Sequence, residues 1–474
     1  MSANAPTRVR LAEAAVSERA AHLRMPFRFG VATLREARQA VLTVRIEAAD
    51  GRSAHGIAAE CLLPKWFDKN PELSNDDNVE QLRTSLAVAL ELYGALGADT
   101  PFGLSAAVYG AQQARCAALG LNPLVASYGP ALVDRAILDA LGRMLGLSFA
   151  AMIRGNLAGI TVTSGLTPDL DGFDLPRFLA HLQPTDTIGV RHTVGLVDPL
   201  TAADPREGPP DGLPQTLEEV VKTYGCRYYK LKAGGDMAAD LDRLTRIAGV
   251  LDATAGEYRA TLDGNEQYSD VDGIVELWRR MAETPALARL CASILYIEQP
   301  ISRTVALERQ VGLLAAEKPV MIDESDATLD AFPRAISLGY NGVSSKTCKG
   351  FYKSILNAAR IARRNAELGE SRFFLSAEDL CTWAGISTQQ DLALVALLGL
   401  THVERNGHHY LDGMSFAPDA EQDAFVKAHP DLYARTPGKP ARLLISGGML
   451  AIGSLDCPGF AVGVPPAGID QTKP

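Results

Sequence analysis

The sequence of 474 residues predicts an α/β protein in which a closed (β/α)8, TIM-type barrel follows an α+β N-terminal domain. From about residue 190 onward, eight short apolar runs alternate with helical patterns. The residues that end five successive runs, Lys230, Asp263, Glu298, Asp323 and Lys346, lie 23 to 35 positions apart. That spacing is near the ~31 residues per strand–helix unit expected when a barrel of about 250 residues is divided into eight units. The first 185 residues show antiparallel strand patterns followed by helices instead.

The N-terminal domain begins with a polar, Ala-rich stretch over residues 1–25, for which we expect a frayed arm or a short helix. QAVLTVRIEA (39–48) then alternates with a period of two and ends at Ala-Asp-Gly, a hairpin signal, before a second strand, HGIAAECLL (55–63). Residues 79–96 and 130–149 repeat apolar side chains at i, i+3, i+4 and i+7, which predicts two helices.

The barrel strands are expected at residues 189–197, 228–233, 258–265, 293–300, 319–325, 341–346, 372–379 and 401–405. Helices are predicted between them, for example at 216–224, 270–283 and 353–368. The Pro- and Gly-rich residues 195–215 predict a long loop after the first strand, either a lid or a specificity loop. No GxGxxG opens a helix after a strand and no GxxxxGK[ST] occurs, which disfavours dinucleotide and P-loop sites.

We therefore expect three parts: an N-terminal α+β domain (1–188), a catalytic barrel (189–406) and a loop-rich C-terminal segment (407–474) that packs back on the first. The net charge of −10 and the pI near 5.4 argue against nucleic-acid partners and anionic membranes. The seven cysteines are scattered singly, and neither a signal peptide nor a membrane span is evident. The expected protein is soluble and cytoplasmic.

Charged residues at the strand ends carry the chemical prediction. At a period of two, Asp263, Glu298 and Asp323 fall on the same strand faces as barrel-lining positions, so three carboxylates converge at the carboxyl ends of the strands. Neighbouring carboxylates repel one another, and a bound Mg²⁺ ion, which prefers oxygen ligands, would offset that repulsion. Asn265 is placed to hold water or substrate near the ion. The alternative is a structural ring of salt bridges between these acids and lysines.

Three lysines flank the acids. Lys230 and Lys232 share one strand face, and Lys346 ends the sixth strand, across the mouth from the second. Burial, a nearby like charge and a metal all lower the pKa of a lysine, so we expect neutral amines at Lys230 and Lys232, which lie two residues apart near the metal. Two amines on opposite sides of one carbon would remove and return a proton next to a carboxylate, through a metal-stabilised enediolate. Taken alone, Lys230 is predicted to be a salt-bridge partner that also tunes the base. Lys349 is predicted to be a solvated loop lysine.

The motifs KLKAGG, LDGNEQY, IEQP, IDES and SSKTCKG, in this order and spacing, resemble the enolase superfamily and most of all its muconate-lactonizing subgroup. PFRFGVATLREARQAVLTVRIEAADG is similar to the start of that family's capping domain. The resemblance implies that Lys232 is a general base, that Lys346 is its partner, and that Asp263, Glu298 and Asp323 bind Mg²⁺. It leaves Glu324 as a rival third ligand, although strand parity favours Asp323. It also implies a small-molecule carboxylate substrate and a homo-oligomer.

Several features bear on the reaction. NGVSSK supplies Lys where the mandelate-racemase branch has Asp, and RFFLSAED has no His, which disfavours that branch. Glu378 ends the seventh strand, where it would pair with Lys346 or Lys349 or bind substrate. Phe27, Phe29 and Trp66 would shape the pocket from the capping domain, or simply be core residues. Racemisation or epimerisation, cycloisomerisation and syn elimination stay open. The alternatives are a Schiff-base-forming lysine aldolase and a catalytically silent carboxylate- or metal-binding relative.

Overall fold

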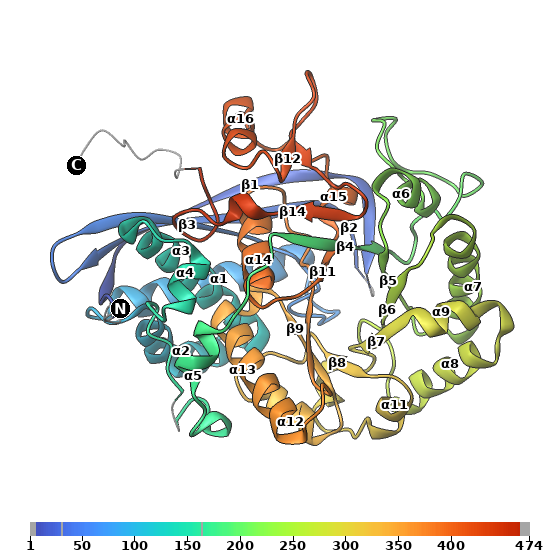
Figure 1. Ribbon diagram of the computed structural model, residues 1–474, viewed down its shortest axis with the longest axis horizontal. Helices are drawn as coiled ribbons and strands as arrows, with labels where there is room; N and C mark the ends of the chain where they lie inside the picture. Colours follow the sequence, from blue (N-terminus) through green and yellow to red (C-terminus); the bar gives the residue numbers. More distant parts are fainter. Residues whose placement is uncertain (1–5, 30–31, 163–164, 465–474) are drawn as a thin grey trace.

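The computed structural model describes residues 6–29, 32–162 and 165–464, and it contains the predicted barrel (Figure 1). Eight parallel strands pair in chain order, and β11 pairs with β4 to close the ring. All eight predicted strands are confirmed. Their bounds are β4 Thr187–Val194, β5 Tyr228–Lys232, β6 Arg259–Asp263, β7 Ile294–Glu298, β8 Val320–Ile322, β9 Gly342–Ser345, β10 Phe374–Ala377 and β11 His402–Arg405.

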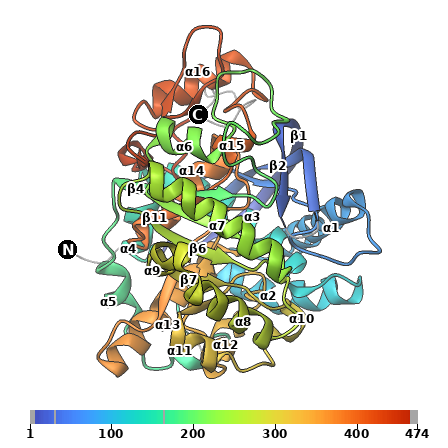
Figure 2. The same ribbon diagram turned by 90° about the vertical axis from the view of Figure 1, so that its right-hand side faces the viewer.

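Helices cover the outside of the barrel, and Figure 2 shows α7 and α8 lying across the face opposite the N-terminal helices. The predicted α6 begins with a capping box in which Thr216 and Glu219 satisfy each other's backbone N–H groups. The side chain of Asp270 caps α8 in the same region of the barrel. The barrel helices are α6 Leu217–Tyr224, α7 Met237–Thr254, α8 Val271–Glu283, α9 Ala288–Ser293, α10 Arg303–Ala306, α11 Gly312–Glu317, α12 Ala331–Ser337, α13 Phe351–Leu368 and α14 Ile386–Leu397.

The N-terminal domain is built on a three-stranded antiparallel sheet of β1 Val9–Phe29, β2 Ala32–Ala48 and β3 Ser53–Cys61. The predicted hairpin between β2 and β3 is confirmed. The expectation of a frayed arm or helix is wrong for residues 9–25, because β1 pairs with β2 along most of its length, and residues 1–5 lie outside the described part of the chain. Residues 13–18 of β1 are exposed on both faces, so the middle of the strand carries no apolar alternation that the sequence could reveal. There the backbone pairing with β2 specifies the strand, whereas Val9, Leu11, Met25 and Phe27 towards its ends are buried in the core.

Helices α1 Asn75–Gly94 and α3 Pro123–Leu145 pack on this sheet, α2 Pro101–Ala118 packs against both of them, and α4 Phe149–Arg154 and α5 Leu175–Ala180 lead to the barrel. The long helix α3 is almost entirely buried. Its Arg135 donates to Glu60 of β3 at 2.9 Å and to Gln390 of barrel helix α14 at 3.3 Å, with Arg135 fully buried. The N-terminal domain and the barrel therefore meet through a buried charged contact as well as apolar packing.

The chain after the last barrel strand returns to both parts. Its elements are α15 Gly407–Tyr410, α16 Asp419–Ala428, β12 Tyr433–Ala434, β13 Arg442–Leu443 and β14 Met449–Ala451. β14 pairs antiparallel with β4, and Phe460 stacks on Phe149 of α4 with ring centroids 3.8 Å apart. Arg19 of β1 also pairs with Glu421 of α16 at 2.5 Å. Among the described helices, none has the length and apolar character needed to cross a bilayer.

A buried acid in this domain makes its stability depend on pH. Asp134 of α3 accepts hydrogen bonds from Tyr93 at 2.6 Å and Ser105 at 2.8 Å, and burial raises its pKa from 3.8 to about 7. The unfolded chain therefore ionises first, and stability is lost as the pH rises from about 4 to 7, by up to about 4 kcal/mol. We expect Asp134→Asn to remove this slope in urea unfolding between pH 5 and pH 8.

The exposed Asp242, for which no ionic partner is described, provides the matched control. Asp242→Asn should leave the pH slope of the parent unchanged. A slope that persists in Asp134→Asn would place its origin in another group.

Candidate functional site

The strand register brings the predicted side chains to one level. Lys232 pairs across the sheet with Asp263, and Asp263 pairs with Glu298, so the ends of β5, β6 and β7 form a row. Asp323 follows β8 directly and Lys346 follows β9. All five side chains are buried, with at most 6% of any of them exposed. The period-two reading of the strands therefore placed these residues correctly.

Lys232 and Lys346 lie on opposite sides of the barrel mouth, because β5 and β9 are four strands apart in a ring of eight. The Nζ atom of Lys232 lies 2.6 Å from Asp263 Oδ2, and that of Lys346 lies 2.6 Å from Asp323 Oδ2. Both lysines line one small chamber of about 20 Å³, which has room for about one water molecule. Phe27, Leu63 and Trp66 of the N-terminal domain also line it, and the ring of Trp66 lies 4.3 Å from Lys346 Nζ.

Lys230 lies at the centre of a ring of carboxylates. Its Nζ atom is within 3.0 Å of an oxygen of each of four acids from four different strand ends: Asp263, Glu298, Glu378 and Glu404. Burial by itself lowers the pKa of Lys230, but these carboxylates outweigh it and raise the pKa well above its usual value. Lys230 is therefore a fixed positive charge, which confirms the salt-bridge part of its predicted role.

The expectation of a lowered pKa is not met at Lys230, and the pKa of Lys346 is raised as well. Burial favours a neutral Lys346, yet Asp323 at 2.6 Å overrides it and raises the pKa of this amine. In return the lysines hold the pKa of Asp323 below its ordinary range. The prediction considered like charges and a metal, whereas in the structure opposite charges at hydrogen-bond distance dominate.

Glu378 was predicted to pair with Lys346 or Lys349, but in the structure it pairs with other residues. It lies beneath the chamber, where it accepts hydrogen bonds from Lys230 at 2.8 Å and from Arg191 of β4. Its side chain has no exposed surface. Its predicted contact with substrate stays a prediction, and its present partners make it a support for Lys230.

Lys349 is not the solvated loop lysine that we expected. It is 3% exposed, donates to Ser344 Oγ at 2.6 Å and lies 3.0 Å from Asp326 Oδ2. Its Nζ atom is also 3.4 Å from Asp323 Oδ1, so Asp323 lies between two lysines. Sequence spacing could not reveal this, because Lys349 belongs to a single 3-10 turn, Thr347–Lys349, that folds back toward β8.

Asp323 and Glu324, the two candidates for the third metal ligand, point into different cavities. Asp323 lines the chamber that contains Lys232 and Lys346. The neighbouring Glu324 lines a separate cavity, where Lys69 Nζ lies 3.5 Å from it. The alternation of side chains at the end of β8 thus separates them, as strand parity predicted.

Sequence reasoning missed several residues of the site. Glu404 is the next-to-last residue of β11, and Asp379 and Asn406 follow β10 and β11; all three line the chamber. The same rule of charged strand ends, applied to the eighth strand, would have found Glu404. Phe27 and Trp66, which were predicted to shape the pocket or to be core residues, line the chamber and are also buried, and the contact of Trp66 with Lys346 joins residues 280 positions apart. The side chain of Phe29 lies outside the described part of the structure.

The donor types of the site fit a hard divalent cation. Asp263, Glu298 and Asp323 offer buried carboxylate oxygens from neighbouring strands, and the Oδ1 atom of Asn265 finds no hydrogen-bond partner among the described residues. Their present arrangement differs from a ligand cluster, because each carboxylate contacts a lysine. Within the described ranges, no group of three or more His, Cys, Asp or Glu side chains stands ready to hold an ion.

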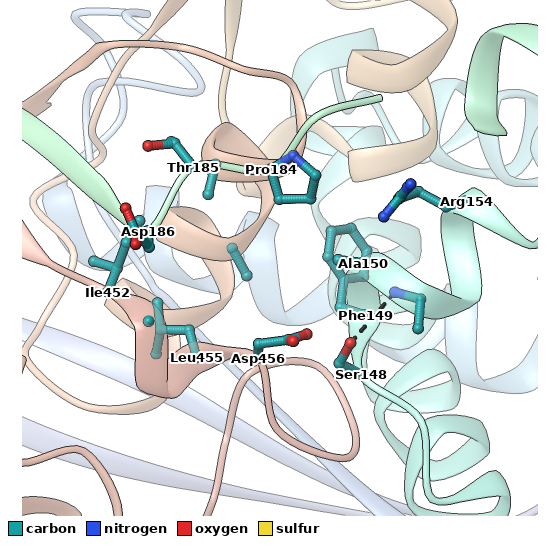
Figure 3. A pocket seen from close by; sticks show the side chains of 14 residues that line it. Ser148, Phe149, Ala150, Arg154, Pro184, Thr185, Asp186, Ile452, Leu455 and Asp456 are labelled. Atoms are coloured by element: carbon teal, nitrogen blue, oxygen red, sulfur yellow. Dashed lines mark hydrogen bonds between the residues drawn. The ribbon is translucent and has the colours of Figure 1, made fainter. Parts of the chain in front are cut away.

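A different cavity, of about 340 Å³, opens at the other end of the strands (Figure 3). Its walls come from α4, from Pro184–Asp186 just before β4, and from the segment after β14, including Ile452 and Asp456. It contains none of the predicted site residues. The chemistry predicted from the sequence therefore belongs to the smaller chamber at the carboxyl ends of the strands.

Comparisons with known proteins bear on the fold. No family model matches the sequence, and a search of the curated proteins finds no match. Solved structures do match. Muconate lactonizing enzyme from Pseudomonas fluorescens, complexed with muconolactone, has 17% identity and a TM-score of 0.56, covering 95% of each chain. The L-Ala-D/L-Glu epimerase from Bacillus subtilis has 16% identity and a TM-score of 0.57, covering 95% of this chain and 98% of that one.

A third match is a dipeptide epimerase from Enterococcus faecalis, complexed with Mg and the dipeptide L-Leu-L-Tyr. It has 15% identity and a TM-score of 0.55, covering 93% of this chain and 99% of that one. At these identities the likeness establishes the fold: an N-terminal domain and a barrel arranged as in these three enzymes.

Proposed function

We propose that this chain is an enolase-superfamily enzyme, an isomerase or lyase that takes a proton from the carbon next to a substrate carboxylate. The observation that carries the proposal is the pair of lysines on opposite sides of one buried chamber. Lys232 reaches it from β5 and Lys346 from β9, each held at 2.6 Å by a carboxylate. A carbon between two such amines exchanges its proton from either face, as racemisation and epimerisation require.

Each charged group has a distinct task. Lys232 and Lys346 are the acid–base pair, and Asp263 and Asp323 orient them. Either amine removes the proton on its own face while the other returns one on the opposite face, so the direction of the reaction sets which of them is the base. Lys230 keeps its charge and holds four carboxylates in place around the chamber. Trp66 and Phe27 close the chamber from the N-terminal domain and exclude water, which strengthens every charge interaction inside it.

We also propose that Asp263, Glu298 and Asp323 hold a Mg²⁺ ion. When bound, the ion would stabilise the negative charge that develops on the substrate carboxylate as the proton leaves. Asn265, with an unpartnered oxygen beside Asp263, would contact the substrate or a bound water.

The function is tested by incubating the protein in D₂O with a set of carboxylic acids that carry an α-hydrogen, and by following deuterium at the α-carbon by NMR. We expect exchange in the presence of Mg²⁺, its loss after EDTA treatment by at least about 10²-fold, and its return when Mg²⁺ is added back. Undiminished exchange in EDTA would contradict the metal assignment. Covalent trapping of a carbonyl substrate by borohydride, without metal dependence, would replace the proposal by a Schiff-base aldolase.

A further inference from the structure

A further pair of opposite charges, Lys349 and Asp326, lies behind the chamber. Both side chains are buried, and Lys349 Nζ is 3.0 Å from Asp326 Oδ2. The backbone N–H of Asp326 donates to the carbonyl of Asp323 at 3.1 Å, so the two acids belong to one turn after β8. Asp323 lines the chamber, whereas Lys349 lines a separate cavity of about 70 Å³ between α13 and the N-terminal helices α2 and α3. Lys349 therefore reaches Asp323 from the side of these helices.

Lys349 divides its contacts between the two acids. It donates to the backbone carbonyl of Asp323 at 3.1 Å and lies 3.4 Å from the Oδ1 atom of that residue. It also donates at 2.6 Å to Ser344 Oγ, and this hydroxyl donates to the same Oδ1 atom. Of its two carboxylate contacts, the one to Asp326 is the shorter, and attraction falls with distance. Asp326 is therefore the nearer counter-ion of Lys349.

Lys353 lies one turn further along the chain and holds Asp326 in place. It donates to the backbone carbonyl of Asp326, and its Nζ atom is 3.3 Å from Asp326 Oδ2, a longer contact than that of Lys349. The other carboxylate oxygen of Asp326, Oδ1, has no hydrogen-bond partner among the described residues. The charge of Asp326 is therefore directed through Oδ2, and Lys349 is the closer of the two lysines that share it.

The division of Lys349 between two acids matters for the metal site. An ammonium group placed fully on Asp323 would compete with a bound cation for its oxygens and would repel that cation. Lys346 already contacts Oδ2 of Asp323 at 2.6 Å. In the part of the chain that the structure describes, Asp323 and Asp326 are the acids that contact Lys349. A buried ammonium group needs a counter-ion, so without Asp326 the charge of Lys349 would be left to Asp323.

We propose that Asp326 is a positioning residue for the metal site, which holds Lys349 and thereby leaves the oxygens of Asp323 available to Mg²⁺. This inference rests on the proposed function, in which Asp263, Glu298 and Asp323 hold the ion. Asp326 acts through Lys349, and this distinguishes it from an acid that attracts the ion through its charge alone.

The test is a double-mutant cycle on Mg²⁺ affinity, measured by titration calorimetry on protein first freed of metal with EDTA. Asp326→Asn should weaken Mg²⁺ binding about tenfold, because the charge of Lys349 then rests on Asp323. Lys349→Met removes the competing ammonium group and should strengthen binding. In the Lys349→Met background, Asp326→Asn should change the affinity by less than about twofold, because the lysine through which it acts is absent.

Asp330→Asn is the matched control, because it removes an exposed acid from the same segment after β8. It should leave Mg²⁺ affinity unchanged with and without Lys349, since exposed charges are screened by solvent and salt.

The outcomes separate this inference from the proposed function. Equal weakening by Asp326→Asn with and without Lys349 would overturn the inference, because the acid would then act through its charge alone. Unchanged Mg²⁺ affinity in Asp326→Asn would refute it as well. If Asp326→Asn does not fold, Lys349→Met decides the question, and an unchanged or weaker affinity in that variant counts against the inference. A parent protein that binds no Mg²⁺ would refute the metal assignment itself, and the inference with it.

Discussion

Replacing either Lys232 or Lys346 by Ala is expected to reduce α-proton exchange by about 10²- to 10⁴-fold, the range over which a positioned acid or base acts. The two amines reach one chamber from opposite strands, so each variant should lose exchange on one face of the substrate carbon. With an enantiomeric pair of substrates, Lys232→Ala and Lys346→Ala should therefore fail on opposite enantiomers. The measurement is deuterium uptake from D₂O, followed by NMR for each enantiomer separately.

Arginine substitutions separate chemistry from structure. Lys232→Arg and Lys346→Arg keep the positive charge beside Asp263 and Asp323, but guanidinium does not give up its proton near neutral pH. They should fold like the parent and still lose exchange. Lys427→Ala, at an exposed position of α16 remote from the strand ends, should have full activity. Unchanged exchange in both Ala variants would exclude the assignment of these lysines.

The second large effect concerns stability and Lys230. In Lys230→Met, the four carboxylates of Asp263, Glu298, Glu378 and Glu404 would face one another with their shared cation removed. Breaking a buried ion pair by deleting one partner costs about 3–5 kcal/mol, and here one partner serves four acids. We expect the urea midpoint of the variant to fall by a corresponding amount, or the protein to fail to fold.

The matched control is Lys427→Met, which makes the same chemical change at an exposed lysine and should leave the urea midpoint unchanged. Recovery of Lys230→Met by Mg²⁺ would indicate that an ion can replace the ammonium within the ring. A variant as stable as the parent would show that the acids of the ring take up protons instead of repelling one another, as the raised pKa of Glu298 already suggests for that residue.

The fold was accessible from the sequence wherever one strand face is buried. The eight barrel strands were recognisable in the sequence as apolar runs. The charged residues near their ends fall on one strand face at a period of two, and this indicated where Asp263, Glu298 and Asp323 lie. The long strand β1 escaped prediction for the opposite reason, since residues 13–18 are exposed on both faces. Local patterns reveal burial, and the exposed middle of this strand, which is held by backbone pairing, leaves no such pattern.

By itself, the sequence determined which charged groups gather at the barrel mouth. Strand periodicity places these side chains on the inner face of each strand, and the closed ring brings the inner faces together. Only the tertiary structure decided how those charges pair. Lys230 pairs with four acids, and Glu378 pairs with Lys230 and Arg191. Lys349 is buried and pairs with Asp323 and Asp326. Pairing depends on distances of 3 Å between residues tens to hundreds of positions apart, and at such distances Coulomb attraction overrides the burial that would otherwise leave a lysine neutral.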